Sequence, residues 1–408
     1  MRLLPREIEE SLKAKDYEII VGIPSYNNSK TIGYVTKTVD EGIIKYFNGN
    51  GLIVNSDGGS TDGTRDVFLK VETKAEKLSF VYEGLPGKGS AMGSIMKIVD
   101  MLEIPVVVFV DSDLRSIEPW WIDRLTRPIL EKRAIYVTPY YVRHKYDGTI
   151  TNNICYPIVS ALFGKKIRQP IGGDFGVSLE LVKNYMSQPE DIWETDVAKF
   201  GVDIWMTTTA IGEKLGEIYQ AALGVKIHDV KDPGKHLGPM FSQVVGTLFR
   251  QVEKYEKLWM GNIEIENVPV FGDIPEVVPE PLNVDVENLR NSARKGIMEN
   301  YDFLSEVLGS DLMSIIDNVK EAGKIDIEQW VKLIYKFMVE YRKQVLRENM
   351  MKALVPLYFA KVADFVERTL DKSDEFAEQL IEEQVEVFKD HKNLLLSFWK
   401  EYKKGRSG

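Results

Sequence analysis

The chain has 408 residues, 44% of them hydrophobic, which is enough for two packed domains or for one large domain with an extension. Its 52 Lys and Arg residues against 62 Asp and Glu residues give a net charge of −10, which argues against wholesale electrostatic capture of nucleic acid or of an anionic membrane. The single cysteine, Cys155, excludes an internal disulfide and a cysteine metal cage. Acidic residues occur too early for a signal peptide, and no apolar stretch reaches the roughly 18 residues of a membrane span, so we expect a cytoplasmic protein.

Apolar strand segments alternate with helical segments over the first part of the chain. The strand segments are residues 17–24, 51–55, 80–82 and 105–110. Strands that alternate with helices of about ten to fifteen residues predict a doubly wound α/β fold with a parallel sheet. The loops that follow the strands should then gather at one edge of that sheet.

The fourth strand segment ends in two carboxylates, Asp111 and Asp113, one residue apart. Ligands bind beyond the carboxyl ends of strands in open α/β sheets, and an Asp-x-Asp at that edge can hold a hard divalent cation. The alternative is a polar turn in which Asp113 or Ser116 caps the following helix. Asp-x-Asp alone does not decide between these interpretations.

The same edge should also carry Tyr26, Asp57 and Lys88, because each follows one of the other strand segments. The segment Gly87-Lys88-Gly89 is either a flexible loop before a helix or an anion site made of backbone N–H groups and a lysine at a helix N-terminus. It is not a Walker A loop, and the chain has no dinucleotide-binding fingerprint.

The next part of the chain, to about residue 231, has two further strand segments, residues 136–141 and 218–227. The basic run 143–145 follows the first of them and is either a solvated surface or a site for an anionic acceptor. Asp203 lies at an expected helix start, as a cap or as a side chain directed into the site. His228 follows the second strand and is either structural or a metal ligand together with carboxylates.

Taken in order, these motifs resemble the glycosyltransferases of the GT-A fold, whose nucleotide-diphospho-sugar transferase domain is Rossmann-like. The motifs are Ile-Pro-Ser-Tyr-Asn (23–27), Ser-Asp-Gly-Gly-Ser-Thr-Asp-Gly-Thr (56–64), Pro-Gly-Lys-Gly (86–89), Asp-Ser-Asp (111–113) and Gly-Val-Lys-Ile-His (224–228). More narrowly, residues 169–174 and 201–203 resemble the glucosyl-3-phosphoglycerate synthases and the mannosylglycerate synthases.

The resemblance implies a role for each matching residue. Pro24, Tyr26, Asp57 and Lys88 would bind the nucleotide-sugar donor, with Asp111 near the ribose or sugar and Asp174 holding sugar hydroxyls. Asp113 and His228 would ligate Mg²⁺ or Mn²⁺, and Asp111 would help the cation indirectly. Arg143, Gly148, Thr151 and Asp203 would bind the acceptor, and the catalytic set would be Asp203, Asp113 and Lys88.

Two positions depart from the pattern of the family. Asn28 stands where many relatives carry an acidic residue, and Thr149 stands where relatives that use phosphoglycerate carry arginine. The second departure leaves open whether the acceptor carries a phosphate.

The resemblance also implies the organisation of the chain. Residues 1–240 would form the GT-A domain, with a nucleotide-sugar half at about 17–115 and an acceptor half at about 116–240. Beyond a proline-interrupted connection at 262–281, periodic apolar residues predict amphipathic helices, so that residues 241–408 would be an α-helical C-terminal extension for packing and oligomerisation. We expect a homodimer.

The activity that the resemblance implies is metal-dependent hexosyl transfer with retention at the anomeric carbon. Glucose or mannose would move from a UDP- or GDP-sugar to 3-phosphoglycerate or glycerate, in the synthesis of a compatible solute. Two alternatives stay open: an inverting, family-2-like glycosyltransferase that acts on a glycan or a lipid-linked acceptor, and a non-catalytic nucleotide-sugar-binding protein. We expect neither nucleic acid nor a membrane span among the partners.

Overall fold

The computed structural model describes residues 2–12, 15–227 and 233–404, which form two compact units. The first unit contains the segments Met1–Val142, Ile167–Pro233 and Asn267–Pro279, and the second contains Arg143–Lys166, Gly234–Glu266 and Glu280–Gly408. The units therefore interleave along the chain, and residues 143–166 belong with the C-terminal helices. The division expected from the sequence, near residue 240, placed this segment in the GT-A domain.

The first unit is built on one eight-stranded sheet with the order β10-β8-β5-β7-β4-β1-β2-β3. All neighbours are parallel except where β7 pairs with β4 and with β5. The strands are β1 (Ile19–Ser25), β2 (Gly51–Asp57), β3 (Glu76–Val81), β4 (Val106–Phe109), β5 (Tyr136–Val142), β7 (Phe175–Ser178), β8 (Ile218–Val225) and β10 (Val270–Phe271). The expected α/β class is confirmed, but the sequence patterns did not reveal β7 or β10.

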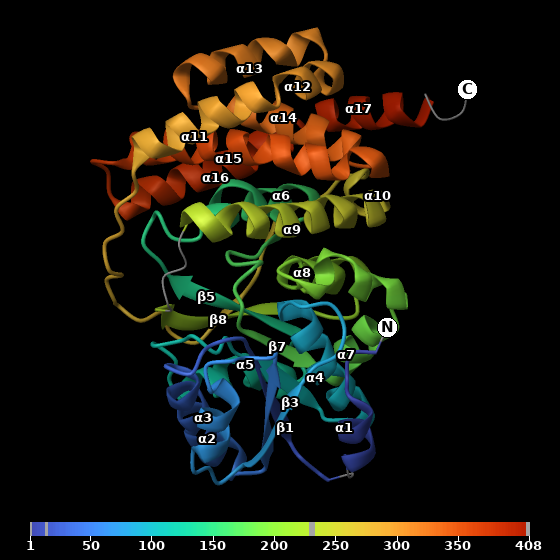
Figure 1. Ribbon diagram of the computed structural model, residues 1–408, viewed down its shortest axis with the longest axis vertical. Helices are drawn as coiled ribbons and strands as arrows, with labels where there is room; N and C mark the ends of the chain where they lie inside the picture. The colour runs from blue at the N-terminus through green and yellow to red at the C-terminus, as the bar shows by residue number, and fades with distance from the viewer. Residues whose placement is uncertain (1, 13–14, 228–232, 405–408) are drawn as a thin grey trace. The chain divides into compact units, whose positions relative to one another are not determined.

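Helices cover both faces of this sheet (Figure 1). One layer contains α2 (Ile32–Phe47), α3 (Thr64–Lys70) and α5 (Trp120–Leu130), and the other contains α4 (Lys88–Leu102), α7 (Leu179–Met186) and α8 (Val202–Glu213). Shorter helical pieces are α1 (Arg6–Ser11), η2 (Glu190–Glu194) and η3 (Asp196–Ala198).

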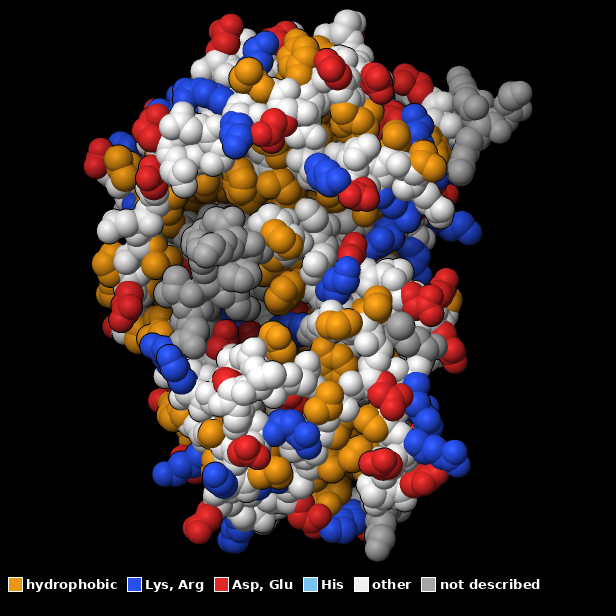
Figure 2. Space-filling model, in the orientation of Figure 1, with side chains coloured by type: hydrophobic (Ala, Val, Ile, Leu, Met, Phe, Trp, Pro, Cys, Tyr) orange, Lys and Arg blue, Asp and Glu red, His pale blue; other side chains and the backbone are white. Residues whose placement is uncertain are grey.

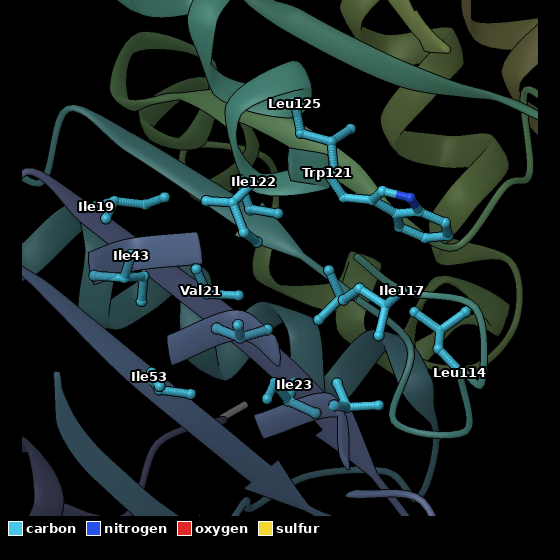
Figure 3. Close-up of a cluster of buried hydrophobic side chains, with 14 of the residues drawn as sticks. Ile19, Val21, Ile23, Ile43, Ile53, Leu114, Ile117, Trp121, Ile122 and Leu125 are labelled. Carbon is cyan, nitrogen blue, oxygen red and sulfur yellow. The ribbon is translucent and has the colours of Figure 1, made fainter. Parts of the chain in front are cut away.

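The first helical layer packs on the sheet through a cluster of buried, mostly aliphatic side chains that includes Trp121 (Figure 3). Val21 and Ile23 of β1, Ile43 of α2 and Trp121 and Ile122 of α5 are all fully buried. Burying such a side chain contributes about 1.5 to 3 kcal/mol. This core therefore holds β1 and β4 firmly, and both strands end at the candidate site.

The second unit is α-helical, as the periodic apolar residues predicted. Its elements are η1 (Thr151–Cys155), α6 (Tyr156–Phe163), α9 (Pro233–Lys254), α10 (Glu256–Trp259), α11 (Val286–Glu299), α12 (Tyr301–Leu308), α13 (Ser310–Ala322), α14 (Ile327–Glu340), η4 (Gln344–Leu346), α15 (Arg347–Thr369), α16 (Asp374–Asp390) and α17 (Lys392–Lys404). Asp285, Asp326 and Ser373 begin α11, α14 and α16, because each side chain accepts a hydrogen bond from the backbone N–H three residues later. The short strands β6 (Lys165–Lys166) and β9 (Glu266–Asn267) lie outside the large sheet.

The surface shown in Figure 2 carries acidic and basic side chains interspersed, as expected for a chain with a modest negative net charge. Within the described residues, no helix is both long enough and apolar enough to cross a bilayer.

Candidate active site

The residues of interest in the first unit come together because one edge of the sheet collects strand ends. Asp57 is the last residue of β2, Asp111 follows β4, and Lys226 follows β8 directly. Asp174 precedes β7, and since β7 runs antiparallel to β4, the start of β7 lies at the same edge. The backbone N–H of Asp111 donates to Oδ1 of Asp174 at 2.9 Å and joins the two segments.

A buried lysine, Lys226, connects these carboxylates. Its Nζ lies 2.7 Å from Oδ2 of Asp111 and 2.8 Å from Oδ2 of Asp174, and it also donates to the carbonyl of Gly172 at 2.8 Å. The Asp174 side chain is fully buried, and the hydroxyl of Tyr141 also donates to it. Burial alone would raise the pKa of Asp111, but Lys226 and Lys88 outweigh it and hold that pKa well below its usual range.

Lys88 is the first residue of α4 and connects the same aspartate to a further carboxylate. Its Nζ lies 2.8 Å from Oδ1 of Asp111 and 3.4 Å from Asp203. Burial would lower the pKa of Lys88, but Asp111 and Asp203 outweigh burial and raise it, so the ammonium stays charged. We call Lys88, Asp111, Asp174, Asp203 and Lys226 the charged cluster.

Asp203 has the least compensated carboxylate of the charged cluster. Burial raises its pKa, although Lys88 opposes the shift, and Oδ1 accepts no hydrogen bond from the described residues. Asp203 does not cap its helix: Gly201 is the N-cap residue, and no side chain bonds there. The sequence left a cap and a site residue open, and the structure places Asp203 against Lys88. A buried oxygen with a vacant lone pair is suited to accept a hydrogen bond from a hydroxyl group.

Three residues expected to bind the donor lie at the ends of β1 and β2. Pro24 is buried within β1, whereas Tyr26, just beyond it, is 63% exposed. The Asp57 carboxylate is fully buried and accepts hydrogen bonds of 2.7 to 2.9 Å from the N–H groups of Gly59 and Ser60 and from the hydroxyls of Ser25 and Ser60. Asp57 thereby fixes the loops after β1 and β2 against each other.

Asn28 ties the first loop to the Asp-Ser-Asp motif. Its Oδ1 accepts from the Ser112 hydroxyl at 2.8 Å and from the Tyr26 N–H at 2.9 Å. The Thr31 hydroxyl donates to the Ser112 carbonyl at 2.8 Å. These bonds orient the turn that carries Asp111 and Asp113.

The glycines beside Lys88 allow close packing, and their own N–H groups already have partners. The N–H of Gly87 donates to the hydroxyl of Tyr82 at 2.8 Å, and that of Gly89 donates to the Lys199 carbonyl at 3.1 Å. A Cβ on Gly89 would lie only 1.8 Å from the Val197 carbonyl oxygen. These two N–H groups are therefore not available to bind an anion, and that part of the prediction is wrong. The positively charged Lys88 is the remaining member of the predicted anion site.

The half-buried Asp113 lies in the turn after β4, and neither it nor Ser116 caps the next helix, whose N-cap Pro119 has no side-chain bond. The predicted cap is therefore wrong, although the segment does form a turn. Instead, Ile227 holds this turn: the Arg115 N–H donates to its carbonyl at 2.8 Å, and its own N–H donates to the Ser116 hydroxyl at 2.9 Å.

A metal site was predicted from Asp113 and His228, and His228 lies outside the described residues. Among the residues that the structure does describe, no group of three or more His, Cys, Asp and Glu side chains could hold a metal ion. Both oxygens of Asp111 contact lysines, so this carboxylate suits an indirect role better than direct ligation. The half-buried carboxylate of Asp113 has the oxygen chemistry that Mg²⁺ and Mn²⁺ prefer.

The remaining candidates, Arg143, Gly148 and Thr151, belong to the second unit and lie together there. Gly148 has a φ of +69°, and a Cβ on it would lie 2.9 Å from Nη1 of Arg143 and 3.8 Å from Oγ1 of Thr151. Arg143 also pairs with Asp147 at 3.7 Å. The positive φ therefore favours glycine at this position, and a Cβ there would also displace the adjacent guanidinium.

The neighbouring polar residues of this segment are bound to helices. The Thr149 hydroxyl lies 2.5 Å from that of Tyr358, and Lys145 donates to the carbonyls of Thr369 and Lys372 at 2.8 and 2.5 Å. Lys145 thus interacts with the C-terminal end of α15, where a cation is favourable. The sequence left the basic run 143–145 as either a solvated surface or an anion site. Within that run, Lys145 stabilises the end of α15.

Sequence reasoning missed Lys226. It lies inside the Gly-Val-Lys-Ile-His motif, which was considered only for its histidine. A lysine directly after an apolar strand was the available signal, because a charged group at that edge needs a partner when it is buried.

No family model matches the chain. Glucosyl-3-phosphoglycerate synthase from Petrotoga mobilis is 25% identical over 270 residues, which cover 62% of this chain and 79% of that protein. The enzyme of the same name from Mycolicibacterium paratuberculosis is 28% identical over 254 residues, covering 56% of this chain and 71% of that protein.

Among solved structures, glucosyl-3-phosphoglycerate synthase from Mycobacterium tuberculosis, in complex with Mn²⁺, UDP and phosphoglyceric acid, matches with a TM-score of 0.47 and 26% identity. The match covers 58% of this chain and 78% of that one. The sequence relatives and the mixed sheet agree with the ordered motifs. The chain therefore resembles the glucosyl-3-phosphoglycerate synthases in sequence, and its mixed α/β sheet is compatible with the GT-A fold that the motifs predict.

Proposed function

We propose that this chain is a metal-dependent, retaining hexosyltransferase that moves glucose from UDP-glucose to 3-phosphoglycerate. The observation that carries the proposal is the charged cluster, which holds Lys88 and Asp203 side by side at the sheet edge where the nucleotide-sugar motifs converge. The relatives named above support the choice of sugar and acceptor.

Lys88 supplies positive charge to the leaving group. Loss of the nucleoside diphosphate develops negative charge on the β-phosphate oxygen, and an ammonium held in place stabilises that charge more than it stabilises the ground state. Asp111 and Asp203 keep Lys88 protonated and restrict where its Nζ can lie. Lys226 holds Asp111 and Asp174 so that both carboxylates keep fixed positions.

Asp113 and His228 are the proposed ligands of a divalent cation, Mg²⁺ or Mn²⁺, and Asp111 supports them indirectly. When bound, the cation neutralises the diphosphate as a Lewis acid. Pro24, Tyr26 and Asp57 are the proposed boundary of the nucleotide site, where Asp57 acts by ordering the loops around it.

Asp203 orients the acceptor. Its Oδ1 lies 3.4 Å from Lys88 Nζ without accepting a hydrogen bond, and it accepts one from the hydroxyl that will attack the sugar, which fixes the direction of approach. Arg143, Gly148 and Thr151 bind the acceptor's anionic groups, with the guanidinium as the principal charge. Asp174 is proposed to hold sugar hydroxyls in addition to its contacts with Lys226.

The decisive experiment measures nucleoside diphosphate release with Mg²⁺ or Mn²⁺, across UDP- and GDP-linked glucose and mannose, with 3-phosphoglycerate and with glycerate as acceptors. We expect release with UDP-glucose and 3-phosphoglycerate and a product that NMR shows to keep the α configuration. A β product would mean an inverting enzyme, and activity only with glycerate would reassign the acceptor. Binding without release across all acceptors would mean a non-catalytic binding protein.

We further propose that the protein is cytoplasmic and forms a homodimer through its helical region. The single, buried cysteine is compatible with a reducing compartment. Light scattering at increasing concentration tests the dimer, and a constant monomer mass would refute it.

A further inference from the structure

A rare helical form begins where the candidate acceptor residues end. Residues Thr151–Cys155 form η1, a single π-helical stretch in which the Tyr156 N–H donates to the Thr151 carbonyl, five residues back. All residues of η1 are buried. π-helical turns are uncommon and occur frequently at functional sites. Such a turn also changes which backbone carbonyls need outside partners.

Two side chains from distant helices supply those partners. The indole N–H of Trp330, in α14, donates to the Asn153 carbonyl at 2.8 Å. The amide of Gln384, in α16, donates to the Asn152 carbonyl at 3.2 Å. Both donors are fully buried, so neither bond competes with water.

The side chains of Asn152 and Asn153 in turn bond to backbone carbonyls of the preceding loop. The Asn153 amide donates to the Thr149 carbonyl at 2.9 Å, and the Asn152 amide donates to the Asp147 carbonyl at 3.2 Å. These bonds fix the residues on both sides of Gly148, whose positive φ already defines a tight turn.

A third helix holds the same loop directly. In α15, the hydroxyl of Tyr358 lies 2.5 Å from that of Thr149, and the ring is fully buried, stacked on Phe241 with centroids 4.3 Å apart. Thr149, which follows Gly148 directly, is thus bonded to a helix of the same unit.

We propose that Trp330, Tyr358 and Gln384 are positioning residues for the acceptor, because they hold the loop that carries Arg143, Gly148 and Thr151. The C-terminal helices thereby have a part in substrate binding as well as in packing. This inference rests on the proposed function, since it takes these three loop residues to be the acceptor site.

The test compares two buried tryptophans whose indole N–H groups donate to different segments of the second unit. Trp330→Phe removes the indole bond to η1 while keeping an aromatic ring. Trp259→Phe is the matched control, because Trp259 is also fully buried in the second unit and also donates a 2.8 Å bond, to the carbonyl of Val252 in α9. The two variants should lose similar stability, which thermal unfolding measures.

We expect Trp330→Phe to raise the KM for the acceptor about tenfold, the effect of one lost hydrogen bond. The KM for the nucleotide sugar should stay within about twofold, and Trp259→Phe should leave both KM values unchanged. Tyr358→Phe should act like Trp330→Phe. Its control is Tyr335→Phe, because the buried Tyr335 hydroxyl bonds instead to the Phe388 carbonyl.

The remaining outcomes would refute the positioning role or the proposed function. If the wild-type enzyme turns over and both members of each pair raise the acceptor KM equally, the effect is a general loss of packing and the positioning role is refuted. Equal changes in the donor and acceptor KM values would refute it as well. If the wild type neither binds nor glycosylates an acceptor, the proposed function fails first, and the positioning role fails with it.

Discussion

Nζ of Lys226 lies 2.7 Å from Oδ2 of Asp111 and forms an ion pair with it, and the same ammonium also pairs with Asp174. Removing the lysine would leave the fully buried Asp174 carboxylate, and the partly exposed Asp111 carboxylate, with less compensation, and breaking a buried pair in this way typically costs about 3 to 5 kcal/mol. We therefore expect Lys226→Met to lower the free energy of unfolding by about that amount and to abolish turnover. Lys226→Arg, which keeps the charge, should recover much of the stability. Denaturant unfolding and initial rates measure the two effects.

The control for this prediction is an exposed pair of similar length. Lys15 and Glu76 lie 2.5 Å apart with side chains 46% and 55% exposed. Lys15→Met should change the stability far less than Lys226→Met does, because water screens such exposed pairs. Equal effects of Lys226→Met and Lys15→Met would contradict the assignment of Lys226 as an organising residue of the charged cluster.

Asp203 gives a second prediction. Asp203→Asn keeps the side-chain volume but removes the charged acceptor oxygen, so we expect kcat to fall about a hundredfold while the affinity for UDP-glucose stays within a few-fold. Steady-state kinetics and calorimetric titration of the donor test this. Wild-type kcat in a folded Asp203→Asn protein would exclude Asp203 from acceptor orientation.

Metal dependence provides a third prediction. Chelation with EDTA should abolish turnover, and Mn²⁺ or Mg²⁺ should restore it. Asp113→Asn should lower kcat/KM by about two orders of magnitude and raise the metal concentration needed for half-maximal rate. Asp66→Asn, at an exposed carboxylate in the first turn of α3, should change neither quantity. Full activity after chelation would remove the cation from the proposed mechanism.

Lys361 makes the stability of the second unit depend on pH. Burial lowers its pKa from 10.5 to about 8, although Asp364, 3.5 Å away, opposes the shift. Between these pH values the unfolded chain binds more protons at this site, so its contribution to stability rises with pH and is lost as the pH falls through about 8. Lys361→Met should remove this slope, which denaturant unfolding at a series of pH values between about 8 and 10.5 would measure. The exposed Lys295, substituted in the same way, should leave the slope unchanged.

Local patterns predicted the elements that are recognisable from their own composition and periodicity. β1, β2 and β4 are short apolar runs, fully buried in the structure, and a strand of that kind is recognisable without knowing its neighbours. The helices after residue 286 were predicted in the same way, because each has a periodic apolar face. The common position of Asp57 and Asp111 at one edge of the sheet followed from the predicted parallel topology alone.

The missed features depend on contacts between distant residues. β7 is only Phe175–Ser178, and it becomes a strand because it fits between β4 and β5. The role of Lys226 depends on Asp111, 115 residues away. The segment 143–166 has no local mark of belonging with the C-terminal helices, since bonds such as that from Trp330 to Asn153 join residues 177 positions apart.

The reversed strand β7 has a consequence for how the catalytic centre can form. In the strand order, β7 is the link between β10-β8-β5 and β4-β1-β2-β3. Until it docks, Lys226 and Asp111 belong to separate partial sheets, and neither part contains a complete charged cluster. Contacts of such long range form late and at a high cost in chain entropy. A folding intermediate with either half-sheet would therefore be inactive, so recovery of activity during refolding should report completion of the whole sheet.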